Sequence, residues 1–129
     1  MKNSLDILVT VREHLLTQRA ISEDESGTCR LRGRDGGRCA IGILIQDQYY
    51  CEGLEGVGIS YYTTGQDGPL LRALLSSGVN AYEPTVGALL RDLEDLHDRG
   101  EISEWEAQLD ELAWRHLGAG LAMTEEVLG

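Results

Sequence analysis

The sequence predicts a small α+β domain that is mainly helical. Apolar residues recur at helical spacing near the N-terminus and again throughout the second half of the chain. Between these parts, an Asp-Gly pair separates two short apolar runs, which is a signal for a β-hairpin. The rest of the middle is rich in glycine and has no apolar period.

The first expected helix runs from Ser4 to about Arg19. Ser4 is a suitable N-cap, and Asp6 lies in the first turn, where the helix dipole favours an anion. Residues 22–27 are polar and are expected to form a loop. The apolar stripe of this helix consists of Leu5, Leu8, Val11 and Leu15, with Ile7, Val9 and Leu16 on its margins.

A small β-hairpin is expected next, formed by residues 28–32 and 38–45 around Asp35-Gly36. Glycine tolerates the positive φ that a type I′ turn requires. The apolar run 38–45 fits either a buried strand or a buried helix, and the alternation of Ile41 and Ile43 favours the strand.

An irregular, glycine-rich middle is expected from about residue 51 to residue 68. Pro69 then suits the first turn of a short helix over residues 70–75, which is expected to end at Ser77-Gly78.

The C-terminal part is expected to form an antiparallel helical hairpin. One helix opens at Pro84 or Thr85 and ends at Arg99-Gly100, and Ser103 with Glu106 has the spacing of a capping box for the next. The apolar faces consist of Val86, Leu89, Leu90, Leu93, Leu96 and His97 on one helix, and of Ile102, Trp105, Leu109, Leu112, His116 and Leu117 on the other.

Length and charge narrow the class of protein. The 129 residues are expected to form a single domain, with residues 118–129 as a tail that docks or frays. With 11 Lys and Arg against 22 Asp and Glu, the net charge is −11, which disfavours direct binding of nucleic acid. We expect a cytoplasmic protein, because no apolar run is long enough for a membrane span and the N-terminal residues do not resemble a signal peptide.

The cysteines and histidines offer little support for a metal site. Cys29, Cys39 and Cys51 are odd in number and form no C-x-x-C pair, so we expect reduced thiols. His14, His97 and His116 could together bind a catalytic zinc, which defines one alternative function, a small metal-dependent hydrolase. The E-x-x-H spacing of Glu94 and His97 would need a second such motif, and none is present. We therefore expect no cofactor, and a hydrogen bond from each histidine to a carboxylate or carbonyl.

Two charge clusters stand out. Nine acidic residues between positions 92 and 111 accompany one basic residue, Arg99. Such a surface attracts basic protein grooves, although the sequence alone favours the simpler interpretation that its charge keeps the protein soluble. The contact residues that we expect are Asp92, Asp95, Asp98, Glu101, Glu104 and Asp110. By contrast, Arg30, Arg32, Arg34 and Arg38 could grip an acidic partner or phosphates, or pair internally with Glu23, Asp24 and Glu25, which we favour.

A series of short motifs is spread over most of the chain: Cys29 to Arg32, Asp35-Gly36, Cys39 to Gly42 with Leu44-Ile45, Tyr50, Glu55-Gly56, residues 93–98 and residues 105–116. It resembles the pattern C-x-x-R, D-G, C-A-[I/V]-G-x-L-I, a downstream tyrosine and E-G of a group of small bacterial and phage proteins. This chain departs from it at Ile43, where some members have a second cysteine, and at Gln46, where proline is common. The resemblance implies a shared fold and no catalytic residue.

The phage association implies a function. Small acidic phage-borne proteins such as anti-CRISPR proteins inhibit host defence by blocking positively charged nucleic-acid grooves, and this chain is similar to them in size and charge. We expect a non-enzymatic, phage-type inhibitor whose partner is the basic surface of a nucleic-acid-binding host protein complex. A further alternative is a dimeric interaction module, in which apolar surface around Trp105 or Tyr61-Tyr62 pairs two copies.

Overall fold

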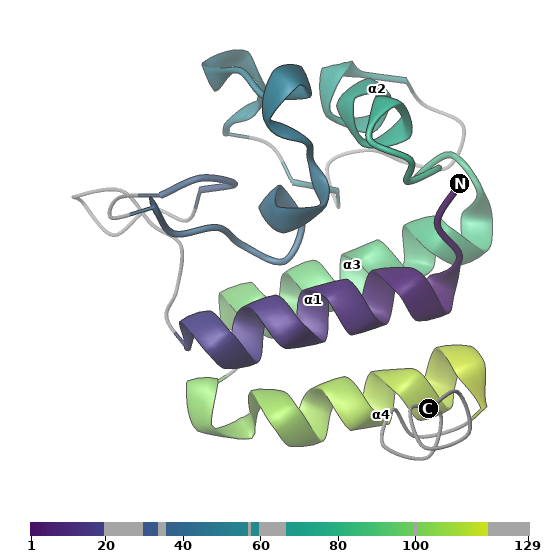
Figure 1. The fold of residues 1–129 in the computed structure, drawn as a ribbon. Helices are drawn as coiled ribbons and strands as arrows, with labels where there is room; N and C mark the ends of the chain where they lie inside the picture. The colour runs from purple at the N-terminus through teal and green to yellow at the C-terminus, as the bar shows by residue number, and fades with distance from the viewer. Residues whose placement is uncertain (20–29, 34–35, 57, 60–66, 100, 119–129) are drawn as a thin grey trace.

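The computed structural model describes residues 1–19, 30–33, 36–56, 58–59, 67–99 and 101–118 (Figure 1). This part of the chain is mainly helical, as the sequence predicts. Its elements are α1 (Ser4–Gln18), η2 (Gly42–Leu44), η3 (Asp47–Tyr49), η4 (Glu52–Leu54), α2 (Pro69–Ser76), α3 (Pro84–Arg99), η6 (Ile102–Glu104) and α4 (Trp105–Leu117), where η denotes a 3-10 helix.

The helix α4 packs against both α1 and α3. Figure 1 shows α1 and α3 between α4 on one side and α2 with the segment that carries the short 3-10 helices on the other. The chain direction reverses between α3 and α4, so the predicted antiparallel helical hairpin is present. Its two long helices are held together by the apolar faces that the sequence indicates, with Leu89, Leu93 and Leu109 fully buried.

The ends of α1 are closed by local hydrogen bonds. Asn3, not the predicted Ser4, is the N-cap: its side chain accepts the Asp6 N–H, and the Asp6 carboxylate accepts the Asn3 N–H. This reciprocal pair satisfies two backbone donors that a helix start leaves open. At the other end, Arg19 adopts φ 48° and donates its N–H to the Leu15 carbonyl.

The prolines open helices as predicted, at Pro69 for α2 and Pro84 for α3. The predicted capping box at the start of the last helix is wrong. The 3-10 helix η6 precedes α4, and the residue at the N-cap position, Glu104, makes no capping hydrogen bond with its side chain. The tighter turn supplies backbone bonds instead, including one from the Glu104 N–H to the Glu101 carbonyl at 2.9 Å.

The prediction of a β-hairpin is wrong, because its two segments, where they are described, do not form a pair of strands. Among the residues with described positions, the hairpin is reduced to one antiparallel bridge between Arg32 and Arg38. The run expected as the second strand turns into η2 instead, where the Leu44 N–H bonds the Ile41 carbonyl. An isolated two-stranded ribbon is marginally stable in water, and no further strand is described that would extend it.

Several predictions concern residues outside the described ranges. These are the loop at residues 22–27, the Asp35 position of the turn, part of the glycine-rich middle, Tyr61-Tyr62 and residues 119–129 of the tail.

The buried side chains form one hydrophobic cluster to which α1, α2, α3, α4 and the 39–45 segment all contribute. Trp105 is its largest side chain and has no exposed surface. The His97 ring is also fully buried and stacks on Trp105, with the ring centroids 5.7 Å apart. The first turn of α4 is therefore fixed against the last turns of α3.

Candidate functional site

A groove of about 330 Å³ lies between α3 and α4. Leu96 and Leu112 contribute its apolar part and are almost fully buried. The groove is otherwise lined by polar and charged side chains: Asp92, Asp95, Gln108, Glu111 and Arg115. It therefore combines an apolar base with three carboxylates and one guanidinium.

Asp92 links the two walls of this groove. Its Oδ2 atom lies 2.7 Å from His116 Nε2 and 3.3 Å from the Arg115 guanidinium. The His116 side chain is 10% exposed and that of Asp92 is 30% exposed, so their contact is partly shielded from water. Because both of its partners belong to α4, Asp92 holds the helical hairpin together.

The six acidic residues predicted as one contact face are divided by the structure. Asp92 and Asp95 line the groove, whereas Asp98 lines a separate pocket on another side of α3. Asp110 follows one helical turn after Glu106, which lies 3.8 Å from Arg12 of α1. Asp95, Glu101, Glu104 and Asp110 are all exposed. The acidic surface thus extends around the helical hairpin instead of forming a single plane.

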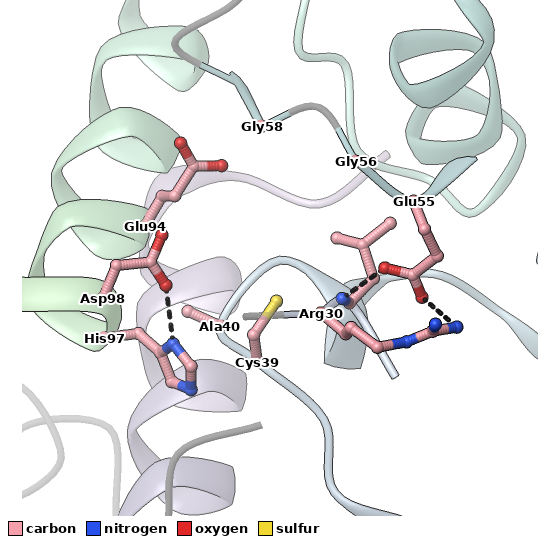
Figure 2. A pocket seen from close by; sticks show the side chains of 10 residues that line it. Arg30, Cys39, Ala40, Glu55, Gly56, Gly58, Glu94, His97 and Asp98 are labelled. Atoms are coloured by element: carbon pink, nitrogen blue, oxygen red, sulfur yellow. Dashed lines mark hydrogen bonds and ion pairs between the residues drawn. The ribbon is translucent and has the colours of Figure 1, made fainter. Parts of the chain in front are cut away.

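The separate pocket has a volume of about 230 Å³ (Figure 2). It lies between α3 and the loop segments that precede η2 and follow η4. Figure 2 shows that the Glu94 and Asp98 side chains border it from α3, with Glu55 and Arg30 on the opposite side. Its lining consists of Arg30, Leu31, Cys39, Ala40, Glu55, Gly56, Gly58, Glu94, His97 and Asp98.

Glu55 organises one side of this pocket. Its carboxylate accepts the backbone N–H groups of Leu31 and Arg32 at 2.8 and 3.1 Å, and the Tyr50 hydroxyl donates to it at 2.5 Å. Burial, together with the hydrogen bond to Glu55, raises the pKa of Tyr50 above its ordinary value. The Arg30 guanidinium is 3.5 Å from the same carboxylate. Glu55 therefore fixes the chain around Leu31 from a distance of more than twenty residues.

The arginine cluster is engaged within the protein. Arg30 donates to Glu52 at 2.7 Å, and Arg32 and Arg38 reach Asp47 at 2.8 and 3.3 Å. Arg32 also lies over a tyrosine ring, 4.3 Å from its centroid. Internal pairing is confirmed for these three arginines, but with acidic residues of η3 and η4. Arg34 and the partners expected at residues 23–25 lie outside the described part of the chain.

On the α3 side, Glu94 accepts the Ile59 N–H at 2.7 Å. A Cβ at Gly58 would lie 2.5 Å from the Glu94 carboxylate oxygens, so any side chain here would require the Glu94 carboxylate to move. The glycine thus allows the backbone to approach α3 closely. Neither Glu55 nor Glu94 was identified as a site residue from the sequence. The sequence features that could have indicated them are the Glu55-Gly56 pair and the nearby Gly58.

The three histidines have three different partners. His14 Nε2 is 2.7 Å from the Arg38 carbonyl, His97 Nδ1 is 2.9 Å from Asp98, and His116 contacts Asp92. Each partner is a carboxylate or a carbonyl, as expected. Within the described ranges, no group of three or more His, Cys, Asp or Glu residues is arranged to hold a metal ion.

Cys39 is expected to resist alkylation while Cys51 reacts readily. Burial raises the pKa of the Cys39 thiol to about 12, so it stays protonated at neutral pH, and only the thiolate is a good nucleophile. Cys51 is exposed. Timed iodoacetamide labelling, located by peptide mass spectrometry, measures both rates, and urea should abolish the difference. Equal rates in the folded protein would contradict the buried position of Cys39.

The two tryptophans differ in exposure. In the alternative of a dimeric module, apolar surface around Trp105 was one of two candidates for pairing copies; Trp105 is fully buried, so its own side chain does not supply such surface. Trp114 is instead 51% exposed on α4. Helical spacing alone assigned Trp105 correctly to the apolar face but gave no reason to single out Trp114.

Comparison of the chain with protein-family models, curated proteins and solved structures finds no match. In the described part of the chain, no helix is long and apolar enough to cross a membrane.

Proposed function

We propose that this chain is a non-enzymatic binding protein whose acidic α3–α4 surface docks on the basic surface of a nucleic-acid-binding host protein complex, as a phage-type inhibitor does. The observation that carries the proposal is the groove between α3 and α4. It offers carboxylates, above all Asp95 and Glu111, beside the apolar Leu96 and Leu112. A lysine or arginine of a partner can bury its aliphatic stem on such a base and keep its charge near the carboxylates.

Charge supports the same proposal. The chain carries a net charge of −11, and the exposed acidic residues of α3, η6 and α4 concentrate part of it on the helical hairpin. A surface of this sign accelerates encounter with a basic groove and excludes nucleic acid from the groove once docked. In the pocket on the other side of α3, the Glu55 and Glu94 carboxylates accept backbone N–H groups of Leu31 and Ile59, so they contribute to the fold.

Reversal of exposed charges tests the proposal. Asp95→Lys combined with Glu104→Lys and Asp110→Lys should abolish binding while leaving the helix content unchanged, because all three side chains are exposed. We omit Asp92 and Asp98, whose contacts with His116 and His97 are part of the fold. The measurement is retention of proteins from nuclease-treated bacterial lysate at low and then moderate salt, followed by a competition assay with nucleic acid for each retained protein.

A one-for-one control separates position from total charge. Asp95→Lys and Glu13→Lys change the net charge equally, but Glu13 is an exposed residue of α1 that does not line the groove. Only Asp95→Lys should weaken binding. The proposal is wrong if the triple variant binds like the wild type, or if the retained partner still binds nucleic acid when saturated with this chain.

A further inference from the structure

Trp114 is an exposed aromatic side chain on an otherwise acidic helix. It is 51% exposed, whereas the other tryptophan of the chain, Trp105, is fully buried. Covering the exposed half of the indole with a partner would remove apolar surface from water. Tryptophan is also among the residue types enriched at the anchors of protein interfaces.

The surroundings of Trp114 are set by helical geometry. Long side chains in an α-helix point back toward the N-terminus, over the residues three and four positions earlier. For Trp114 these are Glu111 and Asp110, which are both exposed. Glu111 is 3.7 Å from Arg115, a weak pair between exposed groups. The indole therefore lies beside two carboxylates that remain accessible to a partner.

We propose that Trp114 is the anchor of the docking surface and accepts the guanidinium group of a partner arginine, which stacks on the indole and pairs with Asp110 and Glu111. This inference rests on the proposed function and names the side chain that the partner must present. An indole face attracts a cation, and the planar guanidinium can stack on the ring and contact a carboxylate at the same time. A lysine ammonium is more strongly hydrated and cannot stack.

The same acidic surroundings argue against two other occupants. A second copy of the chain would bring another net charge of −11 to the same surface, so electrostatics oppose pairing through it. An anionic membrane would be repelled by Asp110 and Glu111 for the same reason. A cationic protein surface satisfies both the exposed ring and the carboxylates.

Tryptophan fluorescence provides a direct test, because the chain has only two tryptophans. The probes are an arginine–glycine peptide without aromatic residues and its lysine counterpart, titrated at low salt. The arginine peptide should change the Trp114 emission and bind several-fold more tightly than the lysine peptide. Trp114→Ala should weaken its binding about tenfold by calorimetry, and Trp114→Phe less, since phenylalanine retains a ring face. Tyr49→Ala, which removes another exposed aromatic side chain, should have no effect.

The outcomes separate this inference from the proposed function. The assignment of Trp114 as the anchor is wrong if the wild type binds the arginine peptide but Trp114→Ala binds it equally well, or if the lysine peptide binds as tightly. Either result leaves the proposed docking of the acidic surface unaffected. If the wild type binds neither peptide nor any basic partner, the proposed function fails as well. Concentration-dependent dimerisation that Trp114→Ala abolishes would overturn the anchor in favour of a second copy.

Discussion

Replacement of Trp105 by alanine is expected to lower the free energy of unfolding by about 3–5 kcal/mol, the range found when large buried aromatic residues are truncated. The Trp105 side chain is fully buried where α4 begins, and its ring stacks on His97. Truncation leaves a cavity at that point, and the buried His97 ring loses the side chain on which it stacks. Since small domains are stable by about 5–15 kcal/mol, this is a large fraction of the total.

Urea unfolding followed by far-ultraviolet circular dichroism measures this loss without relying on tryptophan emission. The matched control is Trp114→Ala, which removes the same side chain from the surface of the same helix and should change stability by less than about 0.5 kcal/mol. Trp105→Phe should be milder than Trp105→Ala, because it keeps an aromatic ring and removes an indole N–H that has no acceptor among the described residues. Equal unfolding midpoints for Trp105→Ala and the wild type would contradict this account of the core.

Gly42→Ala is expected to destabilise the protein by about 3 kcal/mol or more, near the upper end for overpacked sites. A Cβ atom at Gly42 would lie 1.9 Å from the Leu31 carbonyl oxygen. That oxygen belongs to the backbone and accepts the Cys39 N–H, so it cannot rotate away as a side chain would. The whole contact between η2 and the Leu31 segment must open to admit the methyl group.

Gly53→Ala is the control for the intrinsic effect of glycine replacement. Its Cβ would lie 3.7 Å from the Cys51 sulfur, an ordinary contact, so the change should be within about 1 kcal/mol of neutral. Thermal and urea unfolding of both variants give the comparison. If Gly42→Ala is as stable as Gly53→Ala, the close approach of Gly42 to Leu31 is incorrect.

The four α-helices could be predicted from the sequence because each carries its own evidence. Apolar residues at helical spacing mark the buried face, and Pro69 and Pro84 mark two starts. These signals are local, so they do not depend on what the helix packs against. The cap of α1 was placed one residue late, since Asn3 and Ser4 are both good N-caps and only the bond to Asp6 distinguishes them.

The β-hairpin could not be judged locally. The run around Ile41 and Ile43 has strand-like alternation, but it is buried from both sides, and burial removes the distinction between strand and helix periods. Gly42 was the discordant residue: within an apolar run, a glycine often indicates close approach of another backbone segment. Here that segment is the backbone at Leu31. The chain at Gly42 forms a 3-10 turn, and the Gly42 N–H bonds the Cys39 sulfur at 3.2 Å.

The charge of the candidate site could be predicted from the sequence, but the arrangement of its residues could not. Composition and spacing correctly indicated exposed acidic residues on the helical hairpin, yet the use of Asp92 to hold His116 depends on how α3 and α4 face each other. Glu55 and Glu94 were missed because their backbone partners, near Leu31 and at Ile59, are distant in the sequence. Pairing at such range is a property of the folded chain.

The carboxylate of Glu55 has a consequence for the behaviour of the protein at high concentration. A backbone segment that offers free N–H groups can recruit an extended segment of another molecule and begin intermolecular strand pairing, which leads to aggregates. At Leu31 and Arg32, a side chain of the same molecule already occupies those donors. The Glu55 carboxylate oxygens thus accept the N–H groups that a neighbouring strand would bond in a sheet. This stretch of backbone is therefore not available for strand pairing with another molecule.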